Sequence, residues 1–198
     1  MIRKVSEEVN HNYPFDPAHF FYNEKQIDMV INRFHPKTVC ELGAMLGAST
    51  RYWAERVDSV LAVDHWDWKR FESLPQDPND PPQNPSWPIF YEIFVSNCYH
   101  KGLQDKISTL RMTTVEAAEF CKSQGLHFDV IYIDAAHASD AVARDIDLWL
   151  PLGDIICGDD WGWVHEPFNV HGVVKQKAKE NGFRVFGEDN FWMFERNG

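Results

Sequence analysis

The chain has 198 residues, which is the length of one compact domain, and its hydrophobic fraction of 44% is ordinary for a globular fold. The formal charge of -11 disfavours nucleic acids and anionic membranes as partners, because such a surface repels phosphate groups. No apolar run approaches the length of a membrane helix, and the first residues lack the apolar centre of a signal peptide. We therefore expect a cytoplasmic protein. Its four cysteines show no CxxC pair or zinc-ligand spacing, so we expect them to be reduced and packed in the interior: Cys40, Cys98, Cys121 and Cys157.

Short apolar runs alternate with longer amphipathic runs from Thr38 onward. This order predicts an α/β fold of the doubly wound, Rossmann-like type, with a seven-stranded, mostly parallel sheet. Only the turn around Asp189 and Asn190 separates the last two strands, which predicts a C-terminal antiparallel hairpin. The expected strands are 38–43, 59–64, 107–112, 128–134, 153–160, 183–189 and 191–196, and the expected helices are 23–34, 48–57, 89–102, 114–125, 139–151 and 170–182.

One domain, 1–198, accounts for this pattern, with an N-terminal helical extension at 1–37 and a Pro- and Trp-rich insertion at 65–90. Residues 73–88 within this insertion are too rich in Pro, Asp and Asn for a helix or an inner strand. The segment follows the carboxyl end of a strand, where open α/β folds bind ligands. The sequence leaves two interpretations open, a lid over a site and an inert surface insertion.

The strongest motif is ELGAMLGAST, residues 41–50, which follows an expected strand and opens a helix. Gly43 and Gly47 remove side chains where the backbone must turn sharply and approach a ligand, while Ser49 and Thr50 can cap the helix. Such a loop alone can also be a plain strand-to-helix turn. We expect a bound cofactor to lie against residues Glu41, Gly43, Ala44, Gly47 and Ser49.

Asp64 supports this expectation because it ends the next strand, where an acid accepts hydrogen bonds from the ribose hydroxyls of an adenosine cofactor. A dinucleotide dehydrogenase is the obvious rival, but the spacing here is G-x-x-x-G. Glu41, just before the first glycine, would also repel a pyrophosphate, whereas it suits the positively charged methionyl end of S-adenosylmethionine (SAM). SAM is therefore the expected cofactor, and His65 and Asp134 are further candidate contacts to it.

Two threonines follow the third strand, at the edge where the adenine ring of SAM should lie. Thr113 and Thr114 are therefore candidate adenine contacts. The alternative is a Thr cap on the helix that begins near Val115, which is compatible with binding.

Three carboxylates are expected at neighbouring strand ends: Asp134 after the fourth strand, and Asp159 and Asp160 after the fifth. Uncompensated carboxylates so close together are costly, and a hard divalent cation such as Mg²⁺ would relieve the repulsion. Asp159 and Asp160 can alternatively be loop acids that cap a helix.

With these motifs the chain resembles the class I O-methyltransferases, particularly the macrocin and novobiocin type of sugar O-methyltransferases, and more distantly catechol O-methyltransferase. The resemblance runs from Thr38 to the C-terminus and rests on ELGAMLGAST, Asp64, IDAAHASDAVARD, GDD and the terminal helix and hairpin. It implies that Mg²⁺ is held at Asp134, Asp159 and Asp160. Many relatives carry a second acid and a tyrosine where this chain reads AHAS at 136–139, so the substrate contacts are expected to differ.

The implied reaction is direct transfer of the methyl group of SAM to a hydroxyl of a small molecule, with His137 or Asp134 taking the proton. His137 can alternatively cap the helix that begins near Ser139. A metal-independent methyltransferase, a SAM-binding protein without activity and an NAD(P)-binding oxidoreductase remain alternatives. The sequence leaves sugars, phenols and peptides open as acceptors. Five tryptophans either line an acceptor pocket or pack in the core: Trp66, Trp68, Trp87, Trp161 and Trp163.

Overall fold

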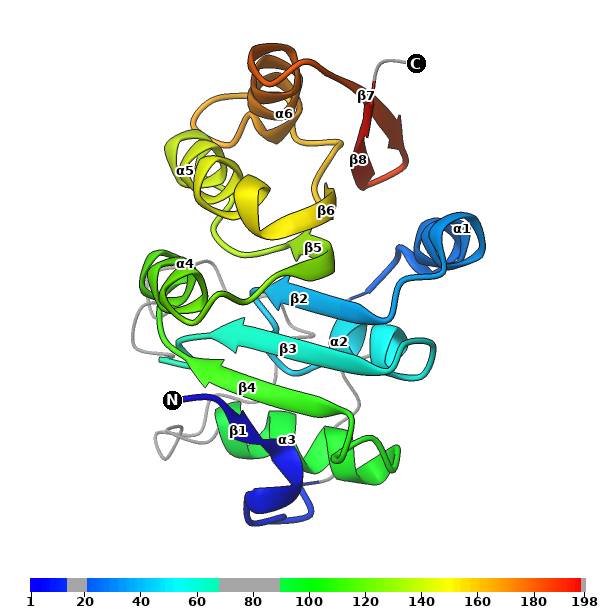
Figure 1. Ribbon diagram of the computed structural model, residues 1–198, viewed down its shortest axis with the longest axis vertical. Helices are drawn as coiled ribbons and strands as arrows, with labels where there is room; N and C mark the ends of the chain where they lie inside the picture. The colour runs from blue at the N-terminus through cyan, green and yellow to red at the C-terminus, as the bar shows by residue number, and fades with distance from the viewer. Residues whose placement is uncertain (14–20, 68–89, 197–198) are drawn as a thin grey trace.

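The centre of the molecule is an eight-stranded sheet in the order β1-β4-β3-β2-β5-β6-β8-β7, seen in a computed structural model that describes residues 1–13, 21–67 and 90–196 (Figure 1). Strands β4, β3, β2, β5 and β6 are parallel, while β1 and the β7–β8 hairpin run antiparallel to their neighbours. The strands are β1 Arg3–Lys4, β2 Thr38–Leu42, β3 Ser59–Asp64, β4 Ile107–Arg111, β5 Phe128–Ile133, β6 Gly153–Gly158, β7 Phe183–Glu188 and β8 Phe191–Arg196.

The predicted fold class is confirmed, and each of the seven predicted strands is present within one or two residues. The additional strand is β1, a two-residue edge strand whose Arg3 pairs with Thr109. The N-terminal extension, 1–37, contains helical and extended elements. In the described part of 1–37, β1 and the short 3-10 helix Val5–Glu7 precede the α-helix, which is α1.

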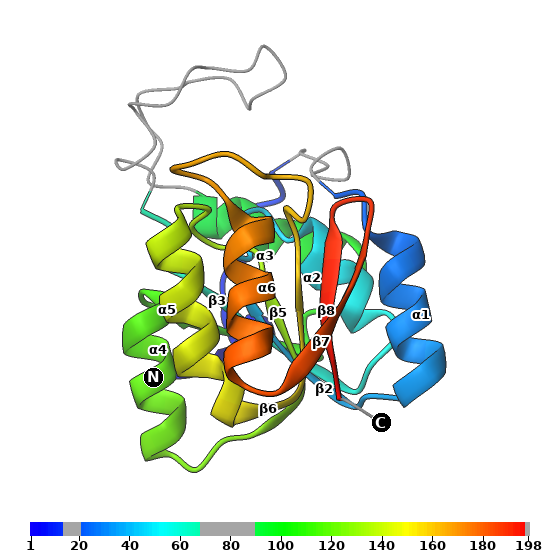
Figure 2. The ribbon, with the colours of Figure 1, turned by 90° about the horizontal axis from the view of Figure 1, so that it is seen from above.

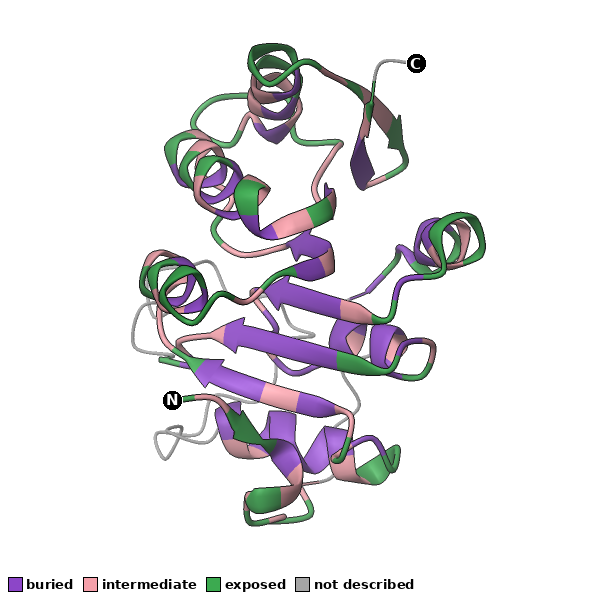
Figure 3. Ribbon diagram, in the orientation of Figure 1, coloured by how far each residue is buried: buried purple, intermediate pink, exposed green. Residues whose placement is uncertain are grey.

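Helices cover both faces of the sheet, which is what buries its central strands (Figure 2). One face carries α1, α2 and α3, and the other carries α4, α5 and α6, each with its own apolar cluster against the strands. Figure 3 shows the purple of buried residues running through β2, β3, β4 and β5. The α-helices are α1 Glu24–Phe34, α2 Ala48–Ala54, α3 Phe90–His100, α4 Thr114–Ser123, α5 Ser139–Trp149 and α6 Val170–Glu180, with a 3-10 turn at Leu150–Leu152.

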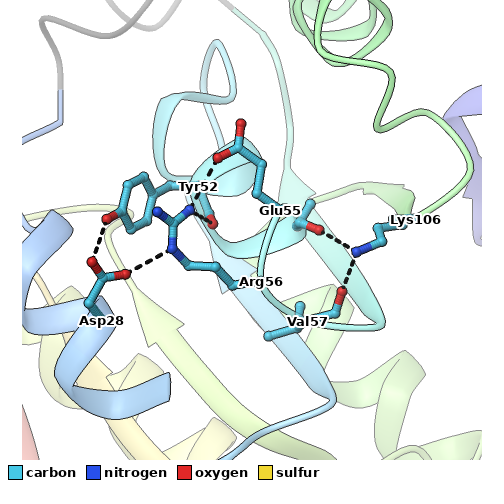
Figure 4. A network of polar contacts seen from close by, with 7 residues as sticks. Asp28, Tyr52, Glu55, Arg56, Val57 and Lys106 are labelled. Atoms are coloured by element: carbon cyan, nitrogen blue, oxygen red, sulfur yellow. Dashed lines mark hydrogen bonds and ion pairs between the residues drawn. The ribbon is translucent and has the colours of Figure 1, made fainter. Parts of the chain in front are cut away.

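A polar network fixes the short helix α2 to its neighbours (Figure 4). Asp28 of α1 accepts hydrogen bonds from the Tyr52 hydroxyl at 2.9 Å and from Arg56 Nε at 2.8 Å. Lys106, just before β4, donates to the carbonyls of Ala54 and Val57 at 2.9 and 2.8 Å. The Lys106 bonds satisfy carbonyl groups at and just after the end of α2, where a helix leaves them without intrahelical partners.

The insertion at 65–90 is described only at its ends, and residues 73–88 lie outside the described residues, so the lid remains a prediction. All four cysteines are buried and free, as expected. Among the described residues no helix combines the length and apolarity needed to cross a membrane.

Candidate functional site

The carboxyl ends of four parallel strands meet at one edge of the sheet. Leu42 of β2 is in register with Val63 of β3 and with Ile133 of β5, and Ile133 is in register with Gly158 of β6. The loops that leave this edge therefore bring together the sequence segments that begin at Gly43, Asp64, Asp134 and Asp159, the candidate residues of the sequence analysis.

The turn after β2 requires its glycines. Gly43 has φ of +88°, and a Cβ built there would lie 1.9 Å from the carbonyl oxygen of Asp134. Gly47 has φ of +84° and is the N-cap residue of α2, with the ring of Phe94 3.0 Å from its virtual Cβ. Only glycine combines this backbone conformation with such close packing. The turn thus lies directly against the end of β5.

Glu41 is fully buried below this turn, and both of its carboxylate oxygens accept hydrogen bonds, from the hydroxyls of Ser49 and Thr50. Burial raises its pKa to about 7, although the two hydroxyls oppose the shift. The prediction that Ser49 and Thr50 cap α2 was wrong, because Gly47 takes the N-cap position and no side chain caps the helix. Their hydroxyls instead anchor α2 to β2.

Asp64 fastens the end of β3 to the glycine turn. Its two carboxylate oxygens accept the backbone N–H of Met45 at 2.9 Å and of Trp66 at 2.7 Å. The indole N–H of Trp66 donates to the carbonyl of Met45 at 2.7 Å. His65 is partly exposed beside them, and its Nδ1 accepts the N–H of Asp67 at 2.8 Å. Asp64 is therefore held rigidly at the edge of the sheet.

The threonines after β4 serve the helix that follows. Thr113 is the N-cap of α4 and forms a reciprocal capping box with Glu116. Thr114 donates its hydroxyl hydrogen to Asp145 at 2.6 Å. The capping alternative is thus confirmed for Thr113, and any contact of these residues with an adenine ring stays a prediction.

A compact acidic group lies where β5 and β6 end. Asp134, His137 and Asp160 each offer one possible ligand atom within 4.8 Å of the others. The Nδ1 atom of His137 lies 2.5 Å from a carboxylate oxygen of Asp160, which itself has φ of +63°. Such a left-handed backbone costs a non-glycine residue about 1 kcal/mol, so the surroundings hold Asp160 in place.

These groups strongly perturb one another. Burial, with repulsion from Asp159 and Asp160, raises the pKa of Asp134 well above its usual range. Burial alone would lower the pKa of His137, but the hydrogen bond and the charge of Asp160 outweigh it, so this pKa is raised. Perturbed groups of this kind cluster at functional sites.

Asp159 precedes Asp160 in the chain but is not one of the three residues of this group. Its Oδ1 accepts the backbone N–H of Asp160 at 2.7 Å. Burial and repulsion from Asp160 raise its pKa, while hydrogen bonds from that N–H and from the side chain of Asn23 oppose the rise. Asn23 was missed in the sequence because an asparagine before a helix is expected to be a cap.

The capping alternatives for the acidic group do not hold. The N-cap of α5 is Ala138 rather than His137, and no side chain caps this helix. The N-cap of α6 is Asn169, whose side chain accepts the N–H of Gly172, so Asp159 and Asp160 do not cap the helix that follows them.

Among the candidate tryptophans that the structure describes, Trp163 packs against this group. Trp163 is 40% exposed, and its ring centroid lies 4.9 Å from that of His137. Trp161 packs on His171 with centroids 4.0 Å apart, and Trp66 is buried among Tyr91 and Phe94. Trp68 and Trp87 lie outside the described residues.

Comparison with known proteins decides the family. A model described as a methyltransferase domain matches residues 40–159, which include the glycine turn, Asp64, Asp134 and Asp159. The chain belongs to this methyltransferase family. A comparison with curated proteins finds no match for this methyltransferase.

Solved structures agree with the family in fold. The methyltransferase is similar to an O-methyltransferase from Bacillus cereus in complex with SAH, at 16% identity and a TM-score of 0.63, over 96% of this chain and 85% of that chain. It is also similar to the O-methyltransferase TomG from Streptomyces achromogenes, involved in tomaymycin synthesis and solved with SAM, at 15% identity and a TM-score of 0.62, over 89% of this chain and 80% of that one. At these identities the likeness concerns the fold.

Proposed function

We propose that this methyltransferase transfers the methyl group of SAM to a hydroxyl of a small molecule, with the help of a divalent cation. The observation that carries the proposal is the convergence of Asp134, His137 and Asp160 within 4.8 Å, at the sheet edge that holds the glycine turn. Two carboxylates and an imidazole suit the activation of a hydroxyl, which must lose a proton as it attacks a methyl group.

The glycine turn and Asp64 support SAM as the methyl donor. Asp64 already accepts one N–H on each carboxylate oxygen, and each oxygen keeps a further lone pair for a ribose hydroxyl. The backbone of Gly43, Ala44 and Gly47 forms the wall beside it. Glu41, fully buried below the turn, places a carboxylate under the cationic methionyl end. The B. cereus and TomG structures, solved with SAH and SAM, support the same assignment.

The donor set fits a divalent cation. Asp134 and Asp160 bring carboxylate oxygens, which Mg²⁺ prefers as ligands, to within 4.8 Å of each other, and Asp159 next to Asp160 is the third proposed ligand. The raised pKa of Asp134 reflects burial together with carboxylate repulsion that a cation would relieve. When bound there, the cation would supply positive charge that lowers the pKa of the acceptor hydroxyl.

His137 is the proposed base. Asp160 contacts its Nδ1, so a proton on that nitrogen leaves Nε2 with the free lone pair that accepts a proton. The carboxylate also fixes the orientation of the imidazole ring, as it does in other carboxylate–histidine pairs. Asp134 and the wall of the glycine turn hold the other side of the site and keep the acceptor oxygen and the methyl donor together.

A small acceptor is favoured by the surface around His137. The exposed ring of Trp163 lies 4.9 Å from that of His137, and the exposed ring of Phe168 meets the Trp163 ring edge-on, so the two offer apolar contact to a ring of the acceptor. The net charge of -11 disfavours nucleic acid as the acceptor. A sugar and a phenol both fit this description.

The test is formation of S-adenosylhomocysteine from SAM with a panel of sugars, phenols and short peptides, in Mg²⁺ and in EDTA. We expect turnover with a hydroxylated acceptor in Mg²⁺ and its loss in EDTA. Full activity in EDTA would contradict the cation, and no turnover with any hydroxylated acceptor, if SAM binds, would favour a binding protein without activity.

Two variants separate the proposed roles. His137→Ala should lower kcat about 100-fold or more and leave SAM affinity unchanged, because it removes only the base. Asp160→Asn should lower kcat and remove the dependence of the remaining activity on Mg²⁺. Calorimetric titration with SAM and initial rates over a Mg²⁺ series measure both effects. If His137→Ala weakens SAM binding as much as it lowers kcat, the result would contradict the role of His137 as the base.

A further inference from the structure

The β7–β8 hairpin lies beside the turn that presents Asp160. In the sheet β8 is the neighbour of β6, and the two strands pair antiparallel at Gly158 and Trp192 (Figure 1). Directly after Gly158 the chain forms residues 159–161, which we call the acidic turn. The end of β6 and the acidic turn are therefore next to the start of β8.

Two hydrogen bonds to the hairpin hold the acidic turn, one on each side of Asp160. Before Asp160, the carbonyl of Asp159 accepts the indole N–H of Trp192 at 2.9 Å. After it, the backbone N–H of Trp161 donates to the carbonyl of Asn190 at 2.8 Å. Asp160 itself has φ of +63°, a left-handed conformation that costs a non-glycine residue free energy. The two bonds fix the backbone on both sides of this residue and so maintain the conformation.

Close packing holds both tryptophan rings in place. A Cβ built at Gly187 of β7 would lie 2.2 Å from the ring of Trp161, and one built at Gly158 would lie 2.7 Å from the ring of Trp192. Neither glycine has a left-handed backbone, so what each one supplies is space for an indole. The indole of Trp192 is also 0% exposed, so its N–H has no access to water as an alternative partner.

The position of the acidic turn determines the contact between Asp160 and His137. A carboxylate oxygen of Asp160 lies 2.5 Å from Nδ1 of His137. A hydrogen bond weakens steeply as the distance and the angle depart from the favourable range, so a shift of the turn by about 1 Å would break this one. The carboxylate reaches the imidazole only while the backbone around it stays where the hairpin holds it.

We propose that Trp192 is a positioning residue, whose indole N–H, together with the carbonyl of Asn190, holds the left-handed turn that places Asp160 against His137. The inference rests on the proposed function for its meaning in catalysis, because Asp160 is there both the partner of the base and a cation ligand. It gives the C-terminal hairpin a part in the site. It also explains the need for an indole, since phenylalanine fills similar space but has no donor.

The first variant is Trp192→Phe, which removes the N–H and keeps an aromatic ring in the core. Its matched control is Trp149→Phe. Trp149 is also 0% exposed and packs in the same apolar cluster, but its indole N–H donates to the carbonyl of Thr114 at 3.1 Å. Each variant loses one indole hydrogen bond in the interior, and only Trp192→Phe loses it at the acidic turn.

The second variant is Gly187→Ala, which disturbs the acidic turn from the other side and serves if Trp192→Phe does not fold. Its methyl group would displace the ring of Trp161. The matched control is Gly153→Ala, whose methyl group would lie 2.5 Å from the side chain of Ile131 at the start of β6, whereas the acidic turn follows the end of that strand. Both variants add one methyl group to a crowded strand glycine.

Two measurements report the position of Asp160. The first is the imidazole ¹⁵N chemical shift of His137 by NMR, in metal-free protein at neutral pH, assigned by its loss in His137→Ala. The second is Mn²⁺ binding followed by electron paramagnetic resonance, without acceptor. We expect Trp192→Phe and Gly187→Ala to move the His137 signal and to weaken Mn²⁺ binding about 10-fold or more, which is typical when support of a metal ligand is lost. The controls should keep both values near wild type, although they too lower the melting temperature.

The proposal is overturned if folded Trp192→Phe leaves the His137 signal in place, or if Trp149→Phe or Gly153→Ala shifts it equally. Where Trp192→Phe does not fold, an unchanged signal in Gly187→Ala overturns it as well. If the wild type binds no Mn²⁺, the cation of the proposed function fails, and the His137 signal alone then decides the role of Trp192. Titration of every variant with SAM separates these results from a general loss of the site.

Discussion

At the scale of single residues, Gly43 should tolerate no side chain. In Gly43→Ala the new methyl group would overlap the backbone of Asp134, and φ of +88° is also unfavourable for alanine. We expect a loss of at least about 3 kcal/mol in the free energy of unfolding, measured by urea denaturation. The matched control is Gly102→Ala, with φ of +68° and nothing within 4 Å, where only the backbone conformation costs about 1 kcal/mol. Equal losses in the two variants would argue against close packing at Gly43.

The residues of the site edge could be predicted from the sequence, but most of their contacts could not. The glycines, Glu41, Asp64 and the carboxylates were visible because their types and spacing are unusual at strand ends. The partners of Ser49 and Thr50 were not visible, because their bonds to Glu41 depend on how α2 packs over β2. Asn23 lies 109 positions from Tyr132, and no local pattern connects the two.

The buried Glu41 should make stability depend on pH. Its pKa is raised from 4.5 to about 7 in the folded protein, so between these values the unfolded chain ionises while the folded chain stays protonated. Stability due to this group is therefore highest below pH 4.5, falls as the pH rises through this window, and is lowest above about 7. The full difference is about 3 kcal/mol.

Glu41→Gln removes this titration and keeps the side-chain shape. The variant should gain stability over the wild type as the pH rises from 5 to 8, by about 2 to 3 kcal/mol in urea denaturation. At pH 5 the two proteins should be nearly equal in stability. The hydroxyls of Ser49 and Thr50 can both accept and donate hydrogen bonds, so they suit a protonated carboxyl and an amide alike. A difference that does not change with pH would mean that Glu41 is already ionised in the folded protein.

At the scale of elements, hydropathy predicted nearly all of the sheet. The expected strand 59–64 is β3 to the residue, and 38–43 exceeds β2 by one position. Short continuous apolar runs carry this information, because the central parallel strands are covered by helices and buried on both faces. β1 was missed because Arg3 and Lys4 are exposed and carry no apolar pattern, so only pairing with β4 makes them a strand.

The two terminal strands should differ in importance. β8 lies between β6 and β7, and its residues Phe191, Trp192 and Met193 are 0% exposed. Removal of residues 189–198 should therefore prevent folding, because it exposes this part of the core. Removal of residues 1–4 takes away only an edge strand and should cost about 1 to 2 kcal/mol. Soluble yield and thermal melting distinguish the two, and a folded 1–188 protein would contradict the inner position of β8.

At the scale of the whole molecule, the two-sided α/β arrangement and the family were both predicted, and both are confirmed. Parallel strands bring residues from 41 to 160 to one edge, which is why distant motifs could be assigned to a single site before their geometry was known. The identity of the methyl acceptor depends on the shape of the loops at this edge, which the hydropathy pattern does not determine. The expectation that nucleic acid and membranes are not partners remains a prediction from charge.

The central claim is that the edge of the sheet binds SAM, and isothermal titration calorimetry tests it most directly. Purified protein is titrated with S-adenosylhomocysteine and, separately, with NAD. We predict saturable binding of one S-adenosylhomocysteine per chain, its loss in Asp64→Ala, and no heat of binding with NAD. Binding of NAD without binding of S-adenosylhomocysteine would contradict the account.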